Sequence, residues 1–357
     1  MKNVSIIGSV GVPAQYGGFE TLAEYLVKYL NEEANITVYC SGTAYKDRLN
    51  SYNGAQLKYI NLNANGVQSI PYDVISILKS LKHSDTILIL GVSGCIILPV
   101  IKLFSKKNII VNIDGLEWKR QKWSRFAKLF LKFSEKIAVK NATSVVTDNK
   151  VIQDYVYSEY NVSSHLIAYG ADHVKKRSLS DEISNKYPFL DGDYYFKVCR
   201  IEPENNVEMI IKAFSINPNF KLVIVGNWQN SEYGCKLKEK YKVFDNLHLL
   251  APIYDQDILN QIRSNCIVYV HGHSAGGTNP SLVEAMSLGL PIVAYGANYN
   301  QETTHFKAHY FDDVESLSET LLRLSKENIM QNSLDMKLIS DQHYTWAKIS
   351  KQYSDLF

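Results

Sequence analysis

The sequence has few of the features that mark secreted, zinc-binding or membrane-spanning chains. Its 357 residues include five cysteines, an odd number with no Cys-x-x-Cys pair, so neither a disulfide framework nor a zinc site is indicated. An uncharged, largely apolar run at Thr86–Ile101 has 16 residues and is broken by Gly91, Gly94 and Pro99. The run is shorter than the ~20 apolar residues that cross a bilayer, so we expect a buried strand and a turn. The first residues lack the apolar core of a signal peptide, and a cytoplasmic, reducing location is expected.

The chain also lacks a strong excess of either charge. The net charge is +2, which taken alone indicates no polyanionic partner. The charges are unevenly spread, however, because residues 1–170 carry 19 Lys and Arg against 13 Asp and Glu, whereas the remainder carries 19 against 23. The basic first half indicates an anionic surface or ligand near it, although unevenly charged solvated faces account for the imbalance equally well.

Short apolar runs alternate with segments of helical spacing along the whole chain. Near-continuous apolar strands joined through helices are typical of parallel sheets covered on both faces. We therefore predict an α/β fold with two doubly wound, Rossmann-like domains that face a central cleft, at residues 1–173 and 174–337. The strand-like runs are Val4–Ile7, Ile36–Tyr39, Thr86–Leu90, Ile109–Asn112, Ser144–Thr147, Tyr195–Cys199, Lys221–Val225, His248–Leu250, Ile267–Val270 and Pro291–Ala294.

The last residues, 338–357, predict a closing helix. Trp346, Ile349 and Tyr353 are three and four residues apart, a spacing that places them on one face of a helix. We expect this aromatic face to pack on one of the two domains.

The first loop, from Gly8 to Gly18, connects a strand to a helix through eleven residues, which is long for a simple connection. Gly17 and Gly18 precede the helix, where backbone N–H groups can approach an anion closely. The loop has neither the Gly-x-Gly-x-x-Gly spacing of a dinucleotide site nor the Gly-Lys-Ser/Thr of a P-loop. We predict a ligand loop, with a plain tight turn as the alternative.

A second group of polar residues follows the predicted strand Ile109–Asn112. Asp114 and Glu117 can each orient or deprotonate a hydroxyl, and a helix-capping or turn role is the alternative for Asp114. A basic and aromatic helix is expected next, over residues 119–140, with Glu135 as its one acidic residue. This composition suits an anionic membrane surface or a lipid-linked phosphate, or else a solvated helix face, and no module for nucleic acid accompanies it. The residues predicted to contact such a lipid-linked ligand or the membrane are Trp118, Lys119, Arg120, Lys122, Trp123, Arg125 and Lys128.

A third group of residues lies in the second half of the chain. Arg200 follows the predicted strand Tyr195–Cys199, where a guanidinium can hold a diphosphate through two hydrogen bonds. A glycine-rich loop then leads into a short helix, with Asn279 as the N-cap and Glu284 one turn inside, where its carboxylate can accept both hydroxyls of a ribose. The remaining candidates for binding such a nucleotide ligand are Asn205, Gly276, Gly277 and Thr278.

Three patterns that could suggest a metal are better explained by other roles. His271 and His273 form a His-x-His pair without a third ligand nearby, which is a weak signal. The segment Asp191–Asp193 precedes a strand and predicts a turn, whereas Asp255–Asp257 precedes an apolar helix and predicts a helix cap. We therefore expect no metal site and no resident cofactor.

Taken together, these residues resemble a known family. The pattern Pro-x3-Glu-Ala-Met-x2-Gly-x-Pro from Pro280 to Pro291, with Arg200 and Gly17-Gly18, is similar to the GT-B glycosyltransferases of family 4. The segments Tyr16–Thr21, Asp114–Arg120 and Gly276–Ser281 resemble the bacterial rhamnosyltransferase subgroup that builds capsules and cell-wall polysaccharides.

The resemblance implies a retaining, metal-independent sugar transfer. The donor would be a nucleotide sugar, dTDP-rhamnose in the subgroup, held by the second domain. The acceptor would be a sugar on a lipid diphosphate of the undecaprenyl type, held by the first domain at the inner face of the bacterial plasma membrane. Two positions depart from the wider family: Gly276 stands where a first glutamate is usual, and Asn205 where a lysine is usual.

Four functions remain open on the sequence alone. They are a rhamnosyltransferase, another hexosyltransferase or an epimerase of the same fold, a dinucleotide-dependent oxidoreductase, and a GT-B protein that binds a donor without turnover. The missing dinucleotide fingerprint argues against the oxidoreductase. Catalytic roles are expected for Asp114, Glu117 and Arg200.

Overall fold

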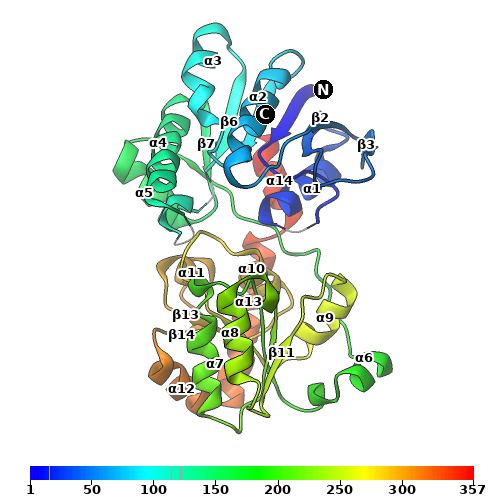
Figure 1. The fold of residues 1–357 in the computed structure, drawn as a ribbon, viewed down its shortest axis with the longest axis vertical. Coiled ribbons are helices and arrows are strands. Elements are labelled where there is room, and N and C mark those ends of the chain that lie inside the picture. The colour runs from blue at the N-terminus through cyan, green and yellow to red at the C-terminus, as the bar shows by residue number, and fades with distance from the viewer. Residues whose placement is uncertain (16, 114, 121–122) are drawn as a thin grey trace. The chain divides into compact units, whose positions relative to one another are not determined.

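The computed structural model describes residues 1–15, 17–113, 115–120 and 123–357. The chain divides into two compact units, each with its own sheet and its own core (Figure 1). Unit 1 comprises Met1–Gly170 together with Trp346–Phe357, and unit 2 comprises Ala171–Thr345. The predicted architecture of two doubly wound α/β domains is confirmed, since all described strand pairs but one are parallel.

The sheet of unit 1 has eight strands in the order β3-β4-β2-β1-β5-β6-β7-β8. Its central strands are buried on both faces, which explains why their sequences are continuous apolar runs without alternation. The short β3 pairs antiparallel with β4, and neither strand was expected from the sequence. The strands are β1 (Lys2–Ile7), β2 (Ala34–Ser41), β3 (Ser51–Tyr52), β4 (Ala55–Ile60), β5 (Thr86–Leu90), β6 (Asn108–Asn112), β7 (Ser144–Thr147) and β8 (His165–Leu166).

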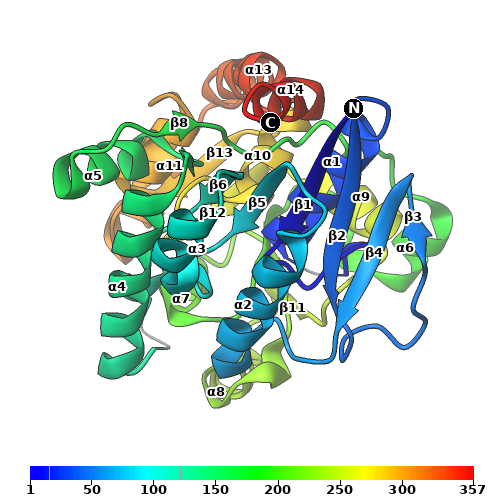
Figure 2. The ribbon, with the colours of Figure 1, turned by 90° about the horizontal axis from the view of Figure 1, so that it is seen from above.

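Helices cover both faces of this sheet. The α1 and α14 helices pack together on one face, and α2, α3 and α4 lie on the other (Figure 2). The helices of unit 1 are α1 (Gly18–Leu30), α2 (Ser69–Ser80), α3 (Leu98–Phe104), α4 (Arg125–Asn141), α5 (Lys150–Tyr160) and α14 (Trp346–Ser354).

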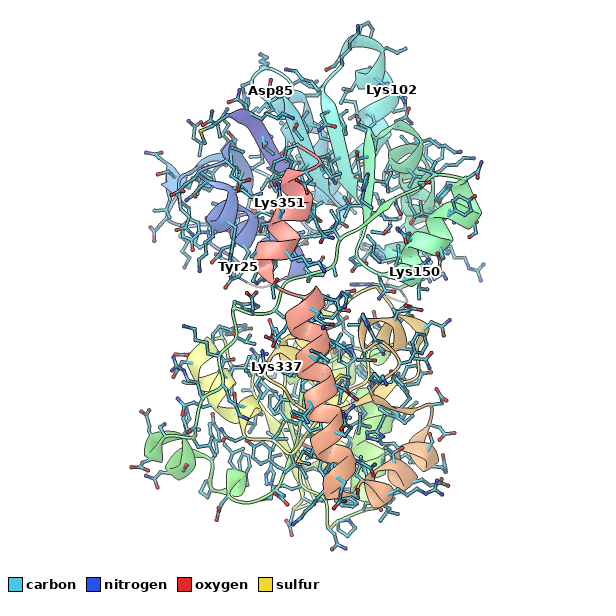
Figure 3. All side chains as sticks on the ribbon, turned by 180° about the vertical axis from the view of Figure 1, so that it is seen from behind. Tyr25, Asp85, Lys102, Lys150, Lys337 and Lys351 are labelled. Atoms are coloured by element: carbon cyan, nitrogen blue, oxygen red, sulfur yellow. The ribbon has the colours of Figure 1, made fainter. Side chains whose placement is uncertain are left out.

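The C-terminal residues do not form the single helix that was expected at 338–357. Helix α13 extends to His343 within unit 2, Tyr344 leaves the helical conformation, and α14 begins at Trp346 in unit 1. The Trp346 ring stacks on the Tyr25 ring of α1 at a centroid distance of 4.4 Å. Figure 3 shows the start of α14 beside the labelled Tyr25. The Asn112 amide donates to the Tyr353 hydroxyl at 2.8 Å. The expected aromatic face is therefore present on α14, where it packs on the first unit.

The basic helix of unit 1 begins later than predicted. Its first residue is Arg125, because the Ser124 hydroxyl caps it by accepting from Ala127 N at 3.3 Å. Residues Glu117–Lys119 form a separate turn. The Trp118 indole donates to Glu135 of α4 at 3.0 Å, so this turn is folded back onto the helix.

Unit 2 contains a six-stranded parallel sheet in the order β11-β10-β9-β12-β13-β14. The strand order reverses between β9 and β12, which is the position where doubly wound sheets bind ligands. The strands are β9 (Tyr195–Val198), β10 (Leu222–Val225), β11 (Leu247–Leu250), β12 (Val268–His271), β13 (Ile292–Tyr295) and β14 (His309–Phe311). The helices are α6 (Asp181–Lys186), α7 (Val207–Ser215), α8 (Glu232–Tyr241), α9 (Gln256–Ser264), α10 (Pro280–Ser287), α11 (Asn298–Thr303), α12 (Val314–Arg323) and α13 (Lys326–His343).

Candidate functional site

The glycine-rich loop of unit 2 lies between β12 and α10, at the reversal of the strand order. Its end is capped as predicted, since the Asn279 side chain accepts from Ser281 N at 3.0 Å and Pro280 is the first residue of α10. The middle of the loop is anchored to the segment after β9, because Ser274 donates through its N–H and its hydroxyl to Glu204 O at 2.8 and 2.9 Å. The backbone N–H groups that open α10 are therefore fixed in direction before any ligand arrives.

Gly276 can only be glycine in this loop. Its φ is +133°, a conformation that L residues rarely adopt, and a Cβ there would lie 2.9 Å from the Nε2 atom of His273. A glutamate at position 276 would therefore be strained and would collide with a buried imidazole. The local backbone conformation therefore favours the glycine that replaces the usual glutamate of the wider family at this position.

Asn205 joins the two halves of the site. Its amide nitrogen donates to Arg200 O at 2.8 Å, and its amide oxygen lies 2.9 Å from Nδ1 of His273. Both ends of the side chain are thus used to hold the segment after β9 against the loop after β12. Asn205 is a candidate for positioning the donor site, and direct contact with a donor stays a prediction.

Arg200 lies two residues after β9, which ends at Val198, one residue earlier than the predicted strand. Its side chain is 40% exposed, and its guanidinium lies 3.7 Å from the Glu202 carboxylate. A guanidinium at the end of this strand, next to the strand that leads into the glycine-rich loop, is available to an anionic ligand.

Glu284 makes contacts that the sequence did not reveal. One carboxylate oxygen is paired with the fully buried Arg263 of α9, and the other lies 3.2 Å from Nε2 of His173. Burial raises the pKa of the Glu284 carboxyl, but Arg263 and His173 outweigh burial and lower the pKa from 4.5 to about 2. The carboxylate is therefore ionised at neutral pH, and its remaining lone pairs can accept hydroxyl hydrogens.

The side chain of Lys197 in β9 is buried, and its amino group lies next to Gly272 of the loop. A Cβ at Gly272 would lie 3.2 Å from Lys197 Nζ and 2.3 Å from Asn205 O, which leaves room for glycine alone at that position. Among the described residues, Lys197 has no carboxylate partner, and burial lowers the pKa of its ammonium. His271 is also buried, and burial lowers the pKa of its ring well below 6.5, so the ring is neutral.

The burial of Lys197 leads to a prediction about stability. Because its pKa is lower in the folded protein than the ordinary 10.5, the charged form opposes folding at neutral pH, and this penalty fades as the pH rises toward 10.5. We expect Lys197→Met to raise the melting temperature at pH 7, by about 2–4 °C for each kcal/mol gained, and to raise it less at pH 10. Thermal unfolding of both proteins at the two pH values measures this, and a gain that grows with pH would contradict it.

The first loop of unit 1 is held by acidic side chains from α1. Glu20 accepts from Val10 N at 2.9 Å, and Glu24 accepts from Ala14 N. A Cβ at Gly17, whose φ is +146°, would lie 1.9 Å from a Glu20 carboxylate oxygen. Donor binding at Gly17 and Gly18 stays a prediction, and the nearby carboxylate disfavours an anion at that point.

Glu117 organises the turn before α4. Its carboxylate accepts from the Trp123 indole at 3.0 Å and pairs with Arg120 Nε at 2.9 Å. Trp118 and Trp123 are partly buried against the core of unit 1, and their contact with an acceptor or a membrane stays a prediction. Asp114 and Lys122 lie outside the described residues. Lys119 and Arg125 are exposed, and Lys128 is half-buried.

The turn and α4 are further joined by a cluster of aromatic rings around Lys132. Its ammonium lies 4.5 Å from the Trp118 ring centroid and 4.7 Å from that of Tyr155. Below it, the buried Glu135 accepts from the hydroxyls of Tyr155 and Tyr160, both at 2.6 Å. Lys132 and Glu135 therefore have a structural role in unit 1.

The described residues contain no group of three His, Cys, Asp or Glu that could hold a metal ion. Asp255 caps α9 by accepting from Asp257 N at 2.9 Å, and the segment at Asp191 is a turn, as predicted. In the part of the chain that the structure describes, no helix combines the length and the apolar character needed to cross a membrane.

Comparisons with known families divide the chain much as the structure does. Residues 180–337 match the family described as glycosyl transferases group 1, and residues 1–172 match a family described as a domain of unknown function, DUF1972. Protein CapJ of Staphylococcus aureus is 24% identical over 273 residues, which cover 72% of this chain and 68% of CapJ.

Solved structures of similar fold cover nearly the whole chain. Sucrose-phosphate synthase from Thermosynechococcus elongatus matches with a TM-score of 0.82 and 16% identity, over 100% of this chain and 98% of the other. HepE of Anabaena, solved in complex with UDP, matches with a TM-score of 0.76 and 14% identity, over 99% of both chains. The protein therefore has the GT-B fold, and residues 180–337 of its second unit match the glycosyl transferases group 1 family.

Proposed function

We propose that this GT-B protein with a group 1 glycosyltransferase domain moves a sugar from a nucleotide-sugar donor onto an acceptor hydroxyl. The observation that carries the proposal is the arrangement after the adjacent strands β9 and β12. Arg200 follows one strand, the capped start of α10 follows the loop after the other, and the ionised Glu284 lies one turn along that helix. Such an arrangement offers two sources of positive potential to a diphosphate and one carboxylate to a ribose.

The proposed chemistry needs no covalent intermediate on the protein. When the sugar leaves, negative charge grows on the diphosphate, and the Arg200 guanidinium and the N–H groups that open α10 stabilise it. Glu284 accepts hydrogen bonds from the ribose hydroxyls and so fixes the nucleotide. The acceptor hydroxyl must be held near the anomeric carbon, which is the role we assign to Asp114 or Glu117 of unit 1. Retention of configuration and independence of metal follow from the family 4 resemblance.

For the donor we propose dTDP-rhamnose. The support is the sequence of the two loops, Tyr16–Thr21 and Gly276–Ser281, which resemble those of the rhamnosyltransferase subgroup. HepE, whose fold is similar, has been solved with UDP-glucose, and so a nucleotide sugar of another kind is the alternative donor.

For the acceptor we propose a sugar carried on a lipid diphosphate of the undecaprenyl type, in the biosynthesis of a capsule or another polysaccharide. The protein would act as a peripheral protein at the cytoplasmic face of the plasma membrane. The support is the basic charge of unit 1. Lys119, Arg125 and Lys128 belong to the segment 119–140, whose one acidic residue, Glu135, is buried.

A panel of donors tests the proposal. The purified protein is incubated with dTDP-rhamnose, UDP-glucose or UDP-N-acetylglucosamine and with a lipid-diphosphate acceptor that carries glucose or N-acetylglucosamine, and products are identified by mass. We expect dTDP-rhamnose to give the fastest transfer, by at least about tenfold, because donor pockets discriminate through several hydroxyl contacts. Transfer from another donor alone would overturn the choice of sugar, and donor binding without turnover would overturn the enzymatic role.

A further inference from the structure

Unit 1 carries apolar side chains on the outside of two neighbouring helices. On α3, Leu103 and Phe104 are 78% and 85% exposed, and Val100 is also exposed. On α4, Phe126 is 86% exposed, and Leu129 and Phe133 are exposed three and seven residues further on. The two helices pack against each other on the same face of the sheet (Figure 2). We call these six residues, Val100, Leu103, Phe104, Phe126, Leu129 and Phe133, the α3–α4 patch.

The patch is not explained by the core. Helix α3 already buries Leu98 and Ile101, and α4 already buries Leu131, Ala138 and Val139 against the sheet. Each helix therefore has a second apolar face that the chain itself does not cover. Exposed aromatic and aliphatic groups on two helices that contact each other mark a surface that binds something apolar.

The charges on the two helices that carry the patch are almost all of one sign. Every charged side chain of α3 and α4 is basic except Glu135, which is buried and held by Trp118, Tyr155 and Tyr160. Lys102, labelled in Figure 3, lies between the apolar positions of α3, and Lys106 is exposed just after that helix. On α4 the basic residues other than Lys132 are Arg125, Lys128, Lys136 and Lys140, which are exposed or half-buried.

We propose that the α3–α4 patch inserts into the surface of an anionic lipid bilayer. Apolar side chains that enter the acyl boundary, surrounded by lysines and arginines that meet acidic headgroups, are the features of an interfacial helix. The charge complementarity selects anionic lipid, and the bulky Phe and Leu side chains select a surface into which they can be inserted. This inference rests on the proposed function for its biological context, because a lipid-linked acceptor is presented at such a surface.

Insertion of apolar side chains adds an attraction to the membrane that charge alone does not provide. Helix α3 was assigned no role by the sequence, and its Leu103 and Phe104 would anchor the protein even where salt screens the lysines. Attraction by charge alone would be lost at high ionic strength, whereas insertion leaves a residual affinity that depends on the apolar side chains.

The test is sedimentation of the full chain with vesicles of phosphatidylcholine, with and without 30% phosphatidylglycerol. We expect binding to the anionic vesicles, and a fall of at least about tenfold for Leu103→Ser/Phe104→Ser and for Phe126→Ser/Phe133→Ser. The matched control is Met330→Ser/Leu334→Ser on α13 of unit 2, which removes exposed apolar side chains of similar size and should change nothing. Binding by the α3 and α4 variants that equals wild type would overturn the proposal, as would binding that vanishes completely at 0.5 M salt.

A second measurement covers the possibility that a serine variant folds poorly. Phe104→Trp keeps the side chain large and apolar, and its fluorescence should be quenched by vesicles with brominated acyl chains, beyond the quenching seen in wild type. Absence of added quenching would overturn insertion. Transfer to a short-chain, water-soluble acceptor separates this inference from the proposed function. The patch variants should keep that activity, and its absence in wild type would count against the proposed function alone.

Discussion

Replacing Glu284 by alanine is expected to abolish sugar transfer and to destabilise unit 2 by about 3–5 kcal/mol at the same time. The transfer is lost because no other carboxylate of α10 can hold the ribose hydroxyls. The stability is lost because Arg263 is fully buried and would keep its charge without the carboxylate that neutralises it. Denaturant unfolding and a transfer assay on the same protein measure the two effects.

Two companion variants show whether the buried charge is the cause. Glu284→Leu combined with Arg263→Met removes both charges, and should recover most of the stability while transfer stays absent. Glu232→Ala breaks an exposed pair with Lys236 on α8 and should cost less than about 1 kcal/mol. A Glu284→Ala protein as stable as wild type would show that the Arg263 charge is neutralised in another way.

The same carboxylate sets a dependence on pH. Its pKa is near 2 in the folded protein against an ordinary 4.5, so its contribution to stability is complete above about pH 4.5 and is lost as the pH falls toward 2. The stability difference between wild type and Glu284→Gln should shrink over that interval.

Replacing Arg200 by alanine is expected to lower kcat by about 10²–10³, with little change in the melting temperature. The guanidinium is proposed to act on the charge of the departing diphosphate, and removing one such donor costs roughly 2.7–4 kcal/mol in the transition state. The side chain is 40% exposed and its one described ionic contact, with Glu202, is 3.7 Å long, so the fold depends on it little.

Arg177→Ala is the matched control for Arg200. Arg177 also belongs to unit 2 and is also exposed, but it pairs with Asp257 of the first turn of α9 at 3.0 Å. The control should keep wild-type turnover. Equal turnover in Arg200→Ala would place the leaving diphosphate elsewhere.

The sequence was sufficient to predict the architecture because buried parallel strands are continuous apolar runs. Thr86–Leu90, for example, was located to the residue. The cap at Asn279 was also predictable, since its chemistry involves only the next two residues. Local rules therefore placed the carboxyl ends of the predicted strands at the observed residue or close to it, and with them the loops that carry the candidate site.

The partners of Glu284 could not be predicted in the same way. His173, Arg263 and Glu284 lie on three segments separated by tens of residues, and only the tertiary fold of unit 2 brings them together. The catalytic role expected for Glu117 rested on its residue type alone. Its contacts with Arg120 and Trp123 depend on a turn that helical spacing did not indicate. The signal that could have suggested Arg263 is its place in the last turn of an amphipathic helix, on the side that is buried.

The division of unit 1 into two stretches of chain has a consequence for synthesis on the ribosome. Residues 171–345 stand between the main body of the unit and the helix that carries Trp346 and Tyr353. A growing polypeptide therefore exposes Tyr25 and the Asn112 amide until α14 has been synthesised. The second unit has every residue it needs earlier, so the part made first is completed last, contrary to the usual order from the N-terminus.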